Sequence, residues 1–195
     1  MLPQPENPPV PPLFPEYSAQ ERTYLLEAAR RAIRAALRRE RWKPNPPSAH
    51  LAEPRGAFTT LHLDDRLRGC VGFVYPVKSL CATVAETAVA AALHDPRFLP
   101  VTEEEAARLQ IEISVLSQLF RIDPRQVEVG RHGLLVSRGF QRGLLLPQVA
   151  VEHGWTREMF LDEACLKAGL APDAWKHGAT VEAFAAEVFG DREGL

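Results

Sequence analysis

Two short apolar segments separated by a pair of aspartates constrain most strongly what this chain can fold into. Residues 56–63 are rich in threonine, phenylalanine and leucine, and after Asp64-Asp65 a second apolar stretch covers residues 67–74. Two such segments around a two-residue polar turn predict an antiparallel β-hairpin. With the aspartates as the loop, the expected register places Cys70 opposite Thr59.

Helical patterns lie on both sides of this hairpin. Ser18 and Glu21 have the spacing of a capping box, and apolar residues then recur at helical intervals to about Arg41. In residues 79–93, alanines surround a stripe of larger apolar side chains, which predicts a closely packed and largely buried helix. Asp95-Pro96 ends this helix.

The second half of the chain mixes strand and helix patterns. In chain order they are a short helix over 102–109 opened by a second capping-box spacing, a strand over 111–115, a hairpin over 133–146, and helices that begin at Pro147 and Thr156. Residues 179–189 are ambiguous, because alanine favours a helix and the larger apolar residues do not settle the period.

The composition narrows the classes of protein that fit this chain. With 195 residues, 46% of them hydrophobic, it can form a core without disulfides. We expect neither export nor membrane insertion, since signal-peptide features and an apolar run of roughly 20 residues are missing. Three widely spaced cysteines without a CxxC pair favour the cytoplasm. Abundant arginine and scarce asparagine fit a thermophilic source, but also a GC-rich genome.

Nucleic-acid binding depends on the arginine-rich face of the predicted first helix. The net charge of -2 provides no overall attraction to nucleic acid or anionic lipid. The arginines of this face are Arg22, Arg30, Arg31, Arg34, Arg38 and Arg39. Such a face is more often solvated than bound to phosphate, so nucleic-acid binding is an alternative and not the leading expectation.

The clearest chemistry lies in the second strand of the predicted hairpin, in residues 67–72 with the sequence LRGCVG. Gly69 and Gly72 leave the sulfur of Cys70 uncrowded and let a ligand approach the backbone. Arg68 shares the face of Cys70 in the expected register, where its charge favours a reactive thiolate. Cys70 is therefore a candidate nucleophile with Arg68 as its electrostatic partner. The open alternative is a cysteine packed as a small buried hydrophobe.

Other polar residues are weaker candidates for the same site. Asp95 and Arg97 flank a proline, where they either contact a ligand or pair with each other. Glu112, on its predicted strand, is a candidate general acid or base. Gln148, at a predicted helix N-terminus, suits an anion such as phosphate or carboxylate. His132, next to the second hairpin, is a candidate base for the site.

Metal and nucleotide sites are not indicated by the sequence. No two of the six histidines are spaced four residues apart, as they would be for a pair of metal ligands on one helix face. A glycine-rich dinucleotide turn and a Walker loop are absent as well, and no motif identifies a cofactor. We therefore expect no metal and leave the cofactor unknown.

The chain resembles a known family. Residues 67–72 resemble the LRGCIG hexapeptide of the AMMECR domain, also called protein A of the AmmeMemoRadiSam system, with valine in place of isoleucine. Further matches follow in order and cover nearly the whole chain after its proline-rich start. They are FTTL at 58–61, DPRF at 95–98, EISVL at 112–116, GLL at 133–135, LLPQVA at 145–150, FL at 160–161 and CLKAGL at 165–170.

The resemblance implies an α+β fold, with a mostly antiparallel sheet, flanking helices and two unequal lobes around a cleft near the hexapeptide. It favours strand over helix for residues 179–189. We expect a proline-rich arm at residues 1–17 and a single AMMECR-type domain at residues 18–195. Some family members are associated with a Memo-type protein and a radical S-adenosylmethionine protein, which are the expected pathway partners.

The leading functional hypothesis is that a small anionic ligand binds in the cleft at the hexapeptide, with Cys70 as a reactive thiol. The resemblance supplies no accepted reaction, so the sequence leaves open whether the chain is a cysteine-dependent enzyme. A non-catalytic domain that receives a peptide or partner protein in the same cleft is the second hypothesis. Nucleic-acid binding is the third.

Overall fold

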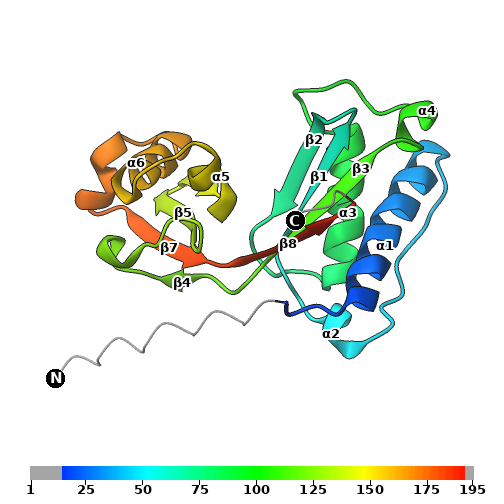
Figure 1. Cartoon of the computed structure of the whole chain (residues 1–195), viewed down its shortest axis with the longest axis horizontal. Coiled ribbons are helices and arrows are strands. Elements are labelled where there is room, and N and C mark those ends of the chain that lie inside the picture. The colour runs from blue at the N-terminus through cyan, green and yellow to red at the C-terminus, as the bar shows by residue number, and fades with distance from the viewer. Residues whose placement is uncertain (1–14, 192–195) are drawn as a thin grey trace. The chain divides into compact units, whose positions relative to one another are not determined.

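The structure, a computed structural model, describes residues 15–191, so most of the arm expected at residues 1–17 lies outside the described residues. The described chain forms two compact units, each with its own hydrophobic core. The first unit comprises residues 15–116 and 187–191, and the second comprises residues 117–186. Helices and antiparallel strands occur in both units (Figure 1), which confirms the α+β fold.

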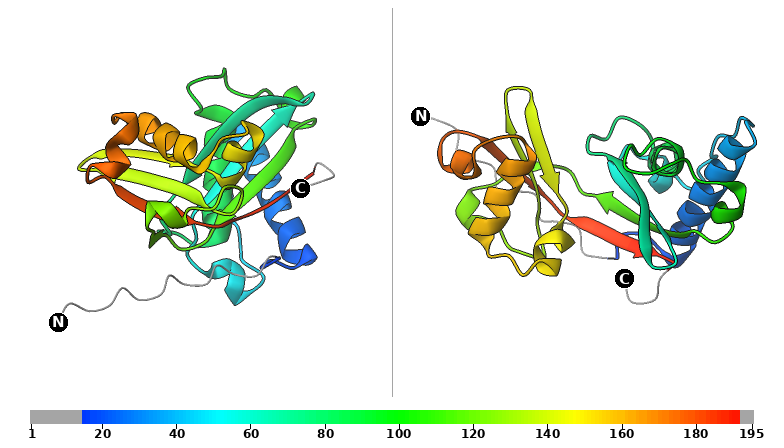
Figure 2. Two further views of the ribbon diagram at one scale, coloured as in Figure 1. Left: turned by 60° about the vertical axis from the view of Figure 1, so that its left-hand side comes forward. Right: turned by 90° about the horizontal axis from the view of Figure 1, so that it is seen from above.

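The first unit is a four-stranded sheet with helices packed on one face. Its strand order is β2 (Arg66–Phe73), β1 (Ala57–Leu63), β3 (Gln110–Leu116) and β8 (Ala186–Gly190), so β2 is an edge strand. Its helices are α1 (Ala19–Leu37), α2 (Ala49–Ala52), α3 (Leu80–Leu93) and α4 (Glu103–Ala106). Helices α1 and α3 lie side by side against the sheet (Figure 2), and alternate strand residues such as Leu61 and Ile113 fill the core beneath them.

Local signals set the ends of these helices. The capping boxes expected at Ser18 and Thr102 are both present. Helix α1 ends at Leu37, before the expected Arg41, and Arg39 has a φ of 58°, which lies outside the helical region. Helix α3 has the predicted bounds, α4 is shorter than predicted, and the short α2 was not predicted.

The hairpin has the predicted loop but not the predicted register. Asp64 and Asp65 take φ values of 50° and 61°, as a two-residue turn of type I′ requires. A β-bulge then shifts the pairing, so that Cys70 lies opposite Thr60 and not Thr59. The register expected from an unbroken ladder is therefore wrong. Thr59 faces the core, and Cys70 lies on the opposite face of the sheet.

The chain returns to the first unit through β8, whose Glu187 fixes the beginning of the fold. This residue is 4% exposed, and its carboxylate accepts hydrogen bonds from the backbone N–H of Glu16 at 2.6 Å and from Arg22 Nε at 3.0 Å. Arg22 Nη2 forms an ion pair with it at 2.7 Å. The residues before α1, α1 itself and β8 are thereby joined around one buried charge.

The second unit has a sheet of its own. Its strand order is β4 (Phe120–Arg121), β7 (Thr180–Phe184), β5 (Gly133–Arg138) and β6 (Gln141–Leu145). The other elements are α5 (Pro147–Glu152), α6 (Arg157–Lys167) and 3₁₀ helices at Pro124–Gln126 and Pro172–Lys176. The predicted hairpin and helices are present, and the ambiguous residues 179–189 form β7 and most of β8. Among the described residues, no helix has both the length and the apolar character that crossing a membrane requires.

Gly69 marks a close contact between the sheet of the first unit and α3. A Cβ at this position would lie 2.1 Å from the carbonyl oxygen of Ala91, a backbone atom that cannot move aside easily. We predict that Gly69→Ala lowers the free energy of unfolding in urea by more than ~2 kcal/mol, because the helix must shift. The control is Gly139→Ala, since Gly139 has open space and a φ of 60°, so that only about 1 kcal/mol of backbone strain is expected. Equal losses would show that this contact does not constrain the sheet.

Candidate functional site

An Asp-Pro-Arg turn that follows α3 covers the edge of the sheet at Cys70. Edge strands expose a row of backbone N–H and C=O groups that no neighbouring strand pairs. Asp95 Oδ2 accepts the Cys70 N–H at 2.9 Å, and Arg97 Nη2 donates to the Cys70 carbonyl oxygen at 3.4 Å. For this one residue of β2, the turn therefore takes the place of a neighbouring strand.

Asp95 and Arg97 also hold each other. The carboxylate of Asp95, which is 4% exposed, accepts hydrogen bonds from the backbone N–H (3.1 Å), Nε (2.9 Å) and Nη2 (2.7 Å) of Arg97. The hydrogen bonds from the Arg97 side chain, and then that from the Cys70 N–H, hold the pKa of Asp95 well below its usual range. Asp95 is thus ionised at neutral pH, whereas the side chain of Arg97 is 54% exposed to solvent.

A second Asp-Pro-Arg turn shows what the first one adds. Asp123 and Arg125 form the same local ion pair at 2.6 Å, and hydrogen bonds from Arg125 lower the pKa of Asp123 to about 2. The side chain of Arg125 is 85% exposed, and the hydrogen bonds of Asp123 lie within its own turn. The local sequence alone therefore produces the ion pair, and the contact with a strand is particular to residues 95–97.

Cys70 is half-buried, and its sulfur contacts a residue of the neighbouring strand. Thr60 Oγ1 of β1 donates to Cys70 Sγ at 3.3 Å. The two residues pair across the strands, but the peptide groups of Cys70 point away from β1, so they form a non-hydrogen-bonded pair. Side chains approach closely in such a pair. Cys81 and Cys165 are fully buried, and burial raises the pKa of Cys81 to about 11 and raises that of Cys165 as well. Cys70 is therefore the cysteine that solvent can reach.

Thr60 also aligns Cys70 with Glu112. It pairs with Cys70 on β2 and with Glu112 on β3, so the three residues form one row across the sheet. The neighbouring Thr59 points to the opposite face, where its hydroxyl shares a hydrogen bond of 2.8 Å with Thr87 of α3. The row of Cys70, Thr60 and Glu112 consequently lies on the face turned away from the helices.

Arg68 forms the bulge of β2 and contacts α4. Leu67 and Gly69 pair with successive residues of β1, which leaves Arg68 as the extra residue. Its guanidinium makes two hydrogen bonds of 3.0 Å to Glu105 and one of 2.9 Å to the carbonyl oxygen of Leu99. Among the described residues, the arginine with a hydrogen bond to Cys70 is Arg97 and not the expected Arg68.

The glycines of the motif are explained by packing. A Cβ on Gly69 would meet the backbone of α3, and a Cβ on Gly72 would lie 2.2 Å from the ring of Phe58. Each glycine therefore admits a neighbouring part of the chain itself.

Thr60 and Ser114 share the face of Cys70 and were missed by the sequence analysis. By strand alternation, Ser114 shares the face of Glu112, and its buried Oγ has no hydrogen-bond partner among the described residues. Neither residue belongs to a chemical motif. Only the observed register shows that they belong to the face of Cys70.

His132 and Gln148 belong to the second unit, whereas Cys70 belongs to the first. His132 Nδ1 accepts the N–H of Glu128 at 3.1 Å, and burial lowers the pKa of this histidine. Gln148 lies in the first turn of the short helix α5. In the part of the chain that the structure describes, no three histidine, cysteine or acidic side chains are grouped as metal ligands.

Contacts within the first unit engage half of the arginine-rich face of α1. Arg22 pairs with Glu187, Arg30 pairs with Asp191, and the guanidinium of Arg31 lies 5.2 Å from the ring centre of Trp42. The remaining arginines of this face are Arg34, Arg38 and Arg39. The set of arginines available to a phosphate backbone is thus smaller than the sequence suggests.

Comparisons with known proteins agree along most of the chain. The family model described as AMMECR1 matches residues 26–189. A protein of Methanopyrus kandleri is 43% identical over 186 residues, which cover 89% of this chain and 90% of that protein. A protein of Pyrococcus furiosus is 44% identical over 180 residues, covering 85% and 86%. The crystal structure of an uncharacterized protein from Pyrococcus horikoshii matches with a TM-score of 0.84 and 40% identity, over 90% of this chain and 93% of that one.

The ion pair of Asp95 predicts a pH-dependent contribution to stability. We expect Asp95→Asn to lower the free energy of unfolding by about 3 kcal/mol at neutral pH, because Arg97 and the Cys70 N–H lose a buried charged partner. The pKa of Asp95 is lowered by folding, so its contribution is complete above the unfolded value of about 3.9 and declines as the pH falls below it. Urea denaturation at several pH values should show the two proteins converging in acid.

The matched control is Asp123→Asn in the exposed turn of the same sequence, for which we expect a much smaller loss. A loss for Asp95→Asn no larger than that of the control would show that the contact with β2 contributes nothing.

Proposed function

This chain belongs to the AMMECR1 family, and we propose that it binds a small anionic ligand at Cys70, with the thiol of Cys70 acting as a nucleophile. The observation that carries this proposal is the position of Cys70 between two hydrogen-bond donors. Thr60 donates to its sulfur, and Arg97 donates to its carbonyl oxygen. The names of these relatives state no activity, so the proposal depends on this geometry.

Arg97 supports the anionic character of the ligand. Its Nε and Nη2 donate to Asp95 and Cys70, and its Nη1 has no hydrogen-bond partner within the described part of the chain. Because more than half of the side chain is exposed, this edge of the guanidinium is open to a carboxylate or phosphate. Asp95 fixes the orientation of the guanidinium, so that little rotamer freedom is lost when a ligand binds.

The row on the sheet supports the role of the thiol. A thiolate, and not the thiol, attacks electrophiles. The hydroxyl of Thr60 donates a hydrogen bond to this sulfur, so the sulfur has a fixed position on the sheet. Glu112 supplies a carboxylate on the same face, which suits the orientation of a polar ligand. We also propose the Memo-type and radical S-adenosylmethionine proteins as pathway partners of this chain.

Alkylation of the three cysteines tests the proposal without knowledge of the natural ligand. Iodoacetate is anionic and iodoacetamide is neutral, and each forms an S–C bond to the thiolate as iodide leaves and the thiol proton passes to solvent. We predict that folding raises the rate ratio of iodoacetate to iodoacetamide at Cys70 about fivefold, the factor that ~1 kcal/mol of charge attraction provides. The reference is the same chain unfolded in urea, and mass spectrometry locates the modification.

Cys81 and Cys165 serve as internal controls, because their burial should protect them while the protein stays folded. Cys70→Ser should remove the rapid modification. A Cys70 that stays unmodified in the folded protein up to about pH 9, above the ordinary thiol pKa of about 8.5, would end the nucleophile hypothesis. A rate ratio that folding does not change would contradict the preference for an anion.

A further inference from the structure

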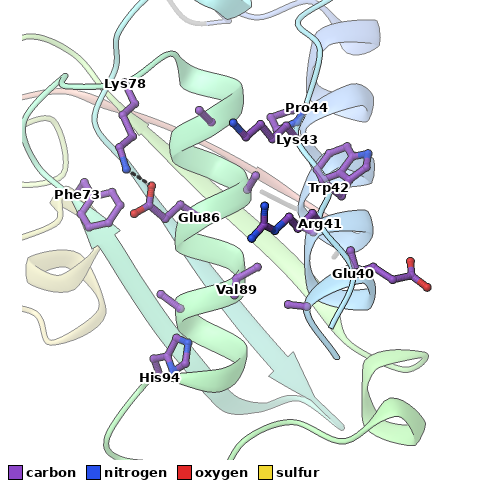
Figure 3. Close-up of a pocket in the computed structure, with 16 residues that line it drawn as sticks. Glu40, Arg41, Trp42, Lys43, Pro44, Phe73, Lys78, Glu86, Val89 and His94 are labelled. Atoms are coloured by element: carbon purple, nitrogen blue, oxygen red, sulfur yellow. Dashed lines mark hydrogen bonds and ion pairs between the residues drawn. The ribbon is translucent and has the colours of Figure 1, made fainter. Parts of the chain in front are cut away.

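A groove of about 820 Å³ lies in the first unit between α1 and α3, with residues 40–44 forming one wall. Its volume is within the range of about 300 to 1,000 Å³ that is typical of small-molecule sites. Figure 3 shows the groove with its wall of loop residues on one side and α3 on the other. None of the lining residues is Cys70, Thr60, Asp95, Arg97 or Glu112, so this site is separate from the one proposed above.

The floor of the groove is made mostly of alanine. Ala32 and Ala36 of α1 face Ala82 and Ala90 of α3 across it. Methyl side chains are too short to fill the space between the loop wall and the helices, so a slim apolar channel remains. Between Ala82 and Ala90 the helix rises by about 12 Å, at roughly 1.5 Å per residue.

Two basic side chains reach into this channel from the loop. Figure 3 shows Arg41 and Lys43 extending toward α3, whereas Glu40 points away. Neither Arg41 nor Lys43 forms an ion pair or a hydrogen bond with another residue of the described range 15–191. On the opposite wall Glu86 is already paired with Lys78. An uncompensated positive charge therefore stands over an apolar floor.

We propose that this groove binds an amphipathic carboxylate, a single anionic head with an unbranched apolar chain. The head lies between Arg41 and Lys43, two residues apart on one wall, and the chain lies along the alanine floor toward Phe73. The alternative occupant is a partner helix with a row of acidic residues, and it would need basic groups along the whole groove. Arg41 and Lys43 instead lie close together on this wall, which fits a ligand with one charged head.

Calorimetric titration of the full chain with decanoate tests this proposal. We expect saturable binding of decanoate, with decanol and acetate each at least about tenfold weaker, since decanol lacks the charged head and acetate lacks the chain.

Arg41→Gln with Lys43→Gln should weaken decanoate binding about tenfold, and Ala90→Leu should weaken it by filling the groove. The matched controls are Arg38→Gln with Arg39→Gln, which removes the same charge outside the groove, and Ala52→Leu at an exposed position of α2. The glutamine variants change only exposed side chains, so they keep the test valid if Ala90→Leu does not fold.

Equal affinity for decanoate and decanol, or equal loss in the glutamine variant and its control, would overturn the proposal. So would an absence of decanoate binding at millimolar concentration. If an acidic amphipathic peptide binds instead, or if the protein dimerises and Ala90→Leu abolishes the dimer, the groove is a protein-docking surface and the proposal is wrong.

Discussion

The carboxylate of Asp95 is the interaction on which the candidate site depends. It accepts the peptide N–H of an edge strand and fixes an arginine through hydrogen bonds, while only 4% of the residue is exposed. A buried charge of this kind is tolerated only when its partners are complete, so β2, the turn after α3 and the guanidinium of Arg97 must assemble together. Cys70 receives its position from that assembly.

The LRGCVG motif distributes several tasks over one strand. Gly69 lets α3 approach the sheet, Arg68 leaves the ladder to bind α4, and Cys70 points to the face opposite the one that α3 covers. These three tasks follow from the bulge and from strand alternation and not from the residue types alone. A motif that identifies a family can therefore contain residues that hold the fold together next to residues that are candidates for chemistry.

What the sequence predicted well is what neighbouring residues determine. The capping box at Ser18 and the turn at Asp64-Asp65 depend on residues a few positions apart, and both are present. The hydrogen bond from Cys70 to Asp95 joins residues far apart in the chain, and so does the contact of Arg68, the bulge residue, with Glu105 of α4. No local pattern reveals either contact. The return of the chain through β8 to complete the first sheet is equally invisible to periodicity.

The most direct test of this account measures the charge preference of alkylation at Cys70 in two arginine variants. Arg97→Gln should reduce the rate ratio of iodoacetate to iodoacetamide to that of the unfolded chain, whereas Arg68→Gln should leave the ratio of the folded protein unchanged, because Arg68 is bound to Glu105. The charge-preserving variant Arg97→Lys should keep most of the preference. A preference that survives Arg97→Gln but disappears in Arg68→Gln would contradict the central claim that Asp95 and Arg97 build the anion site at Cys70.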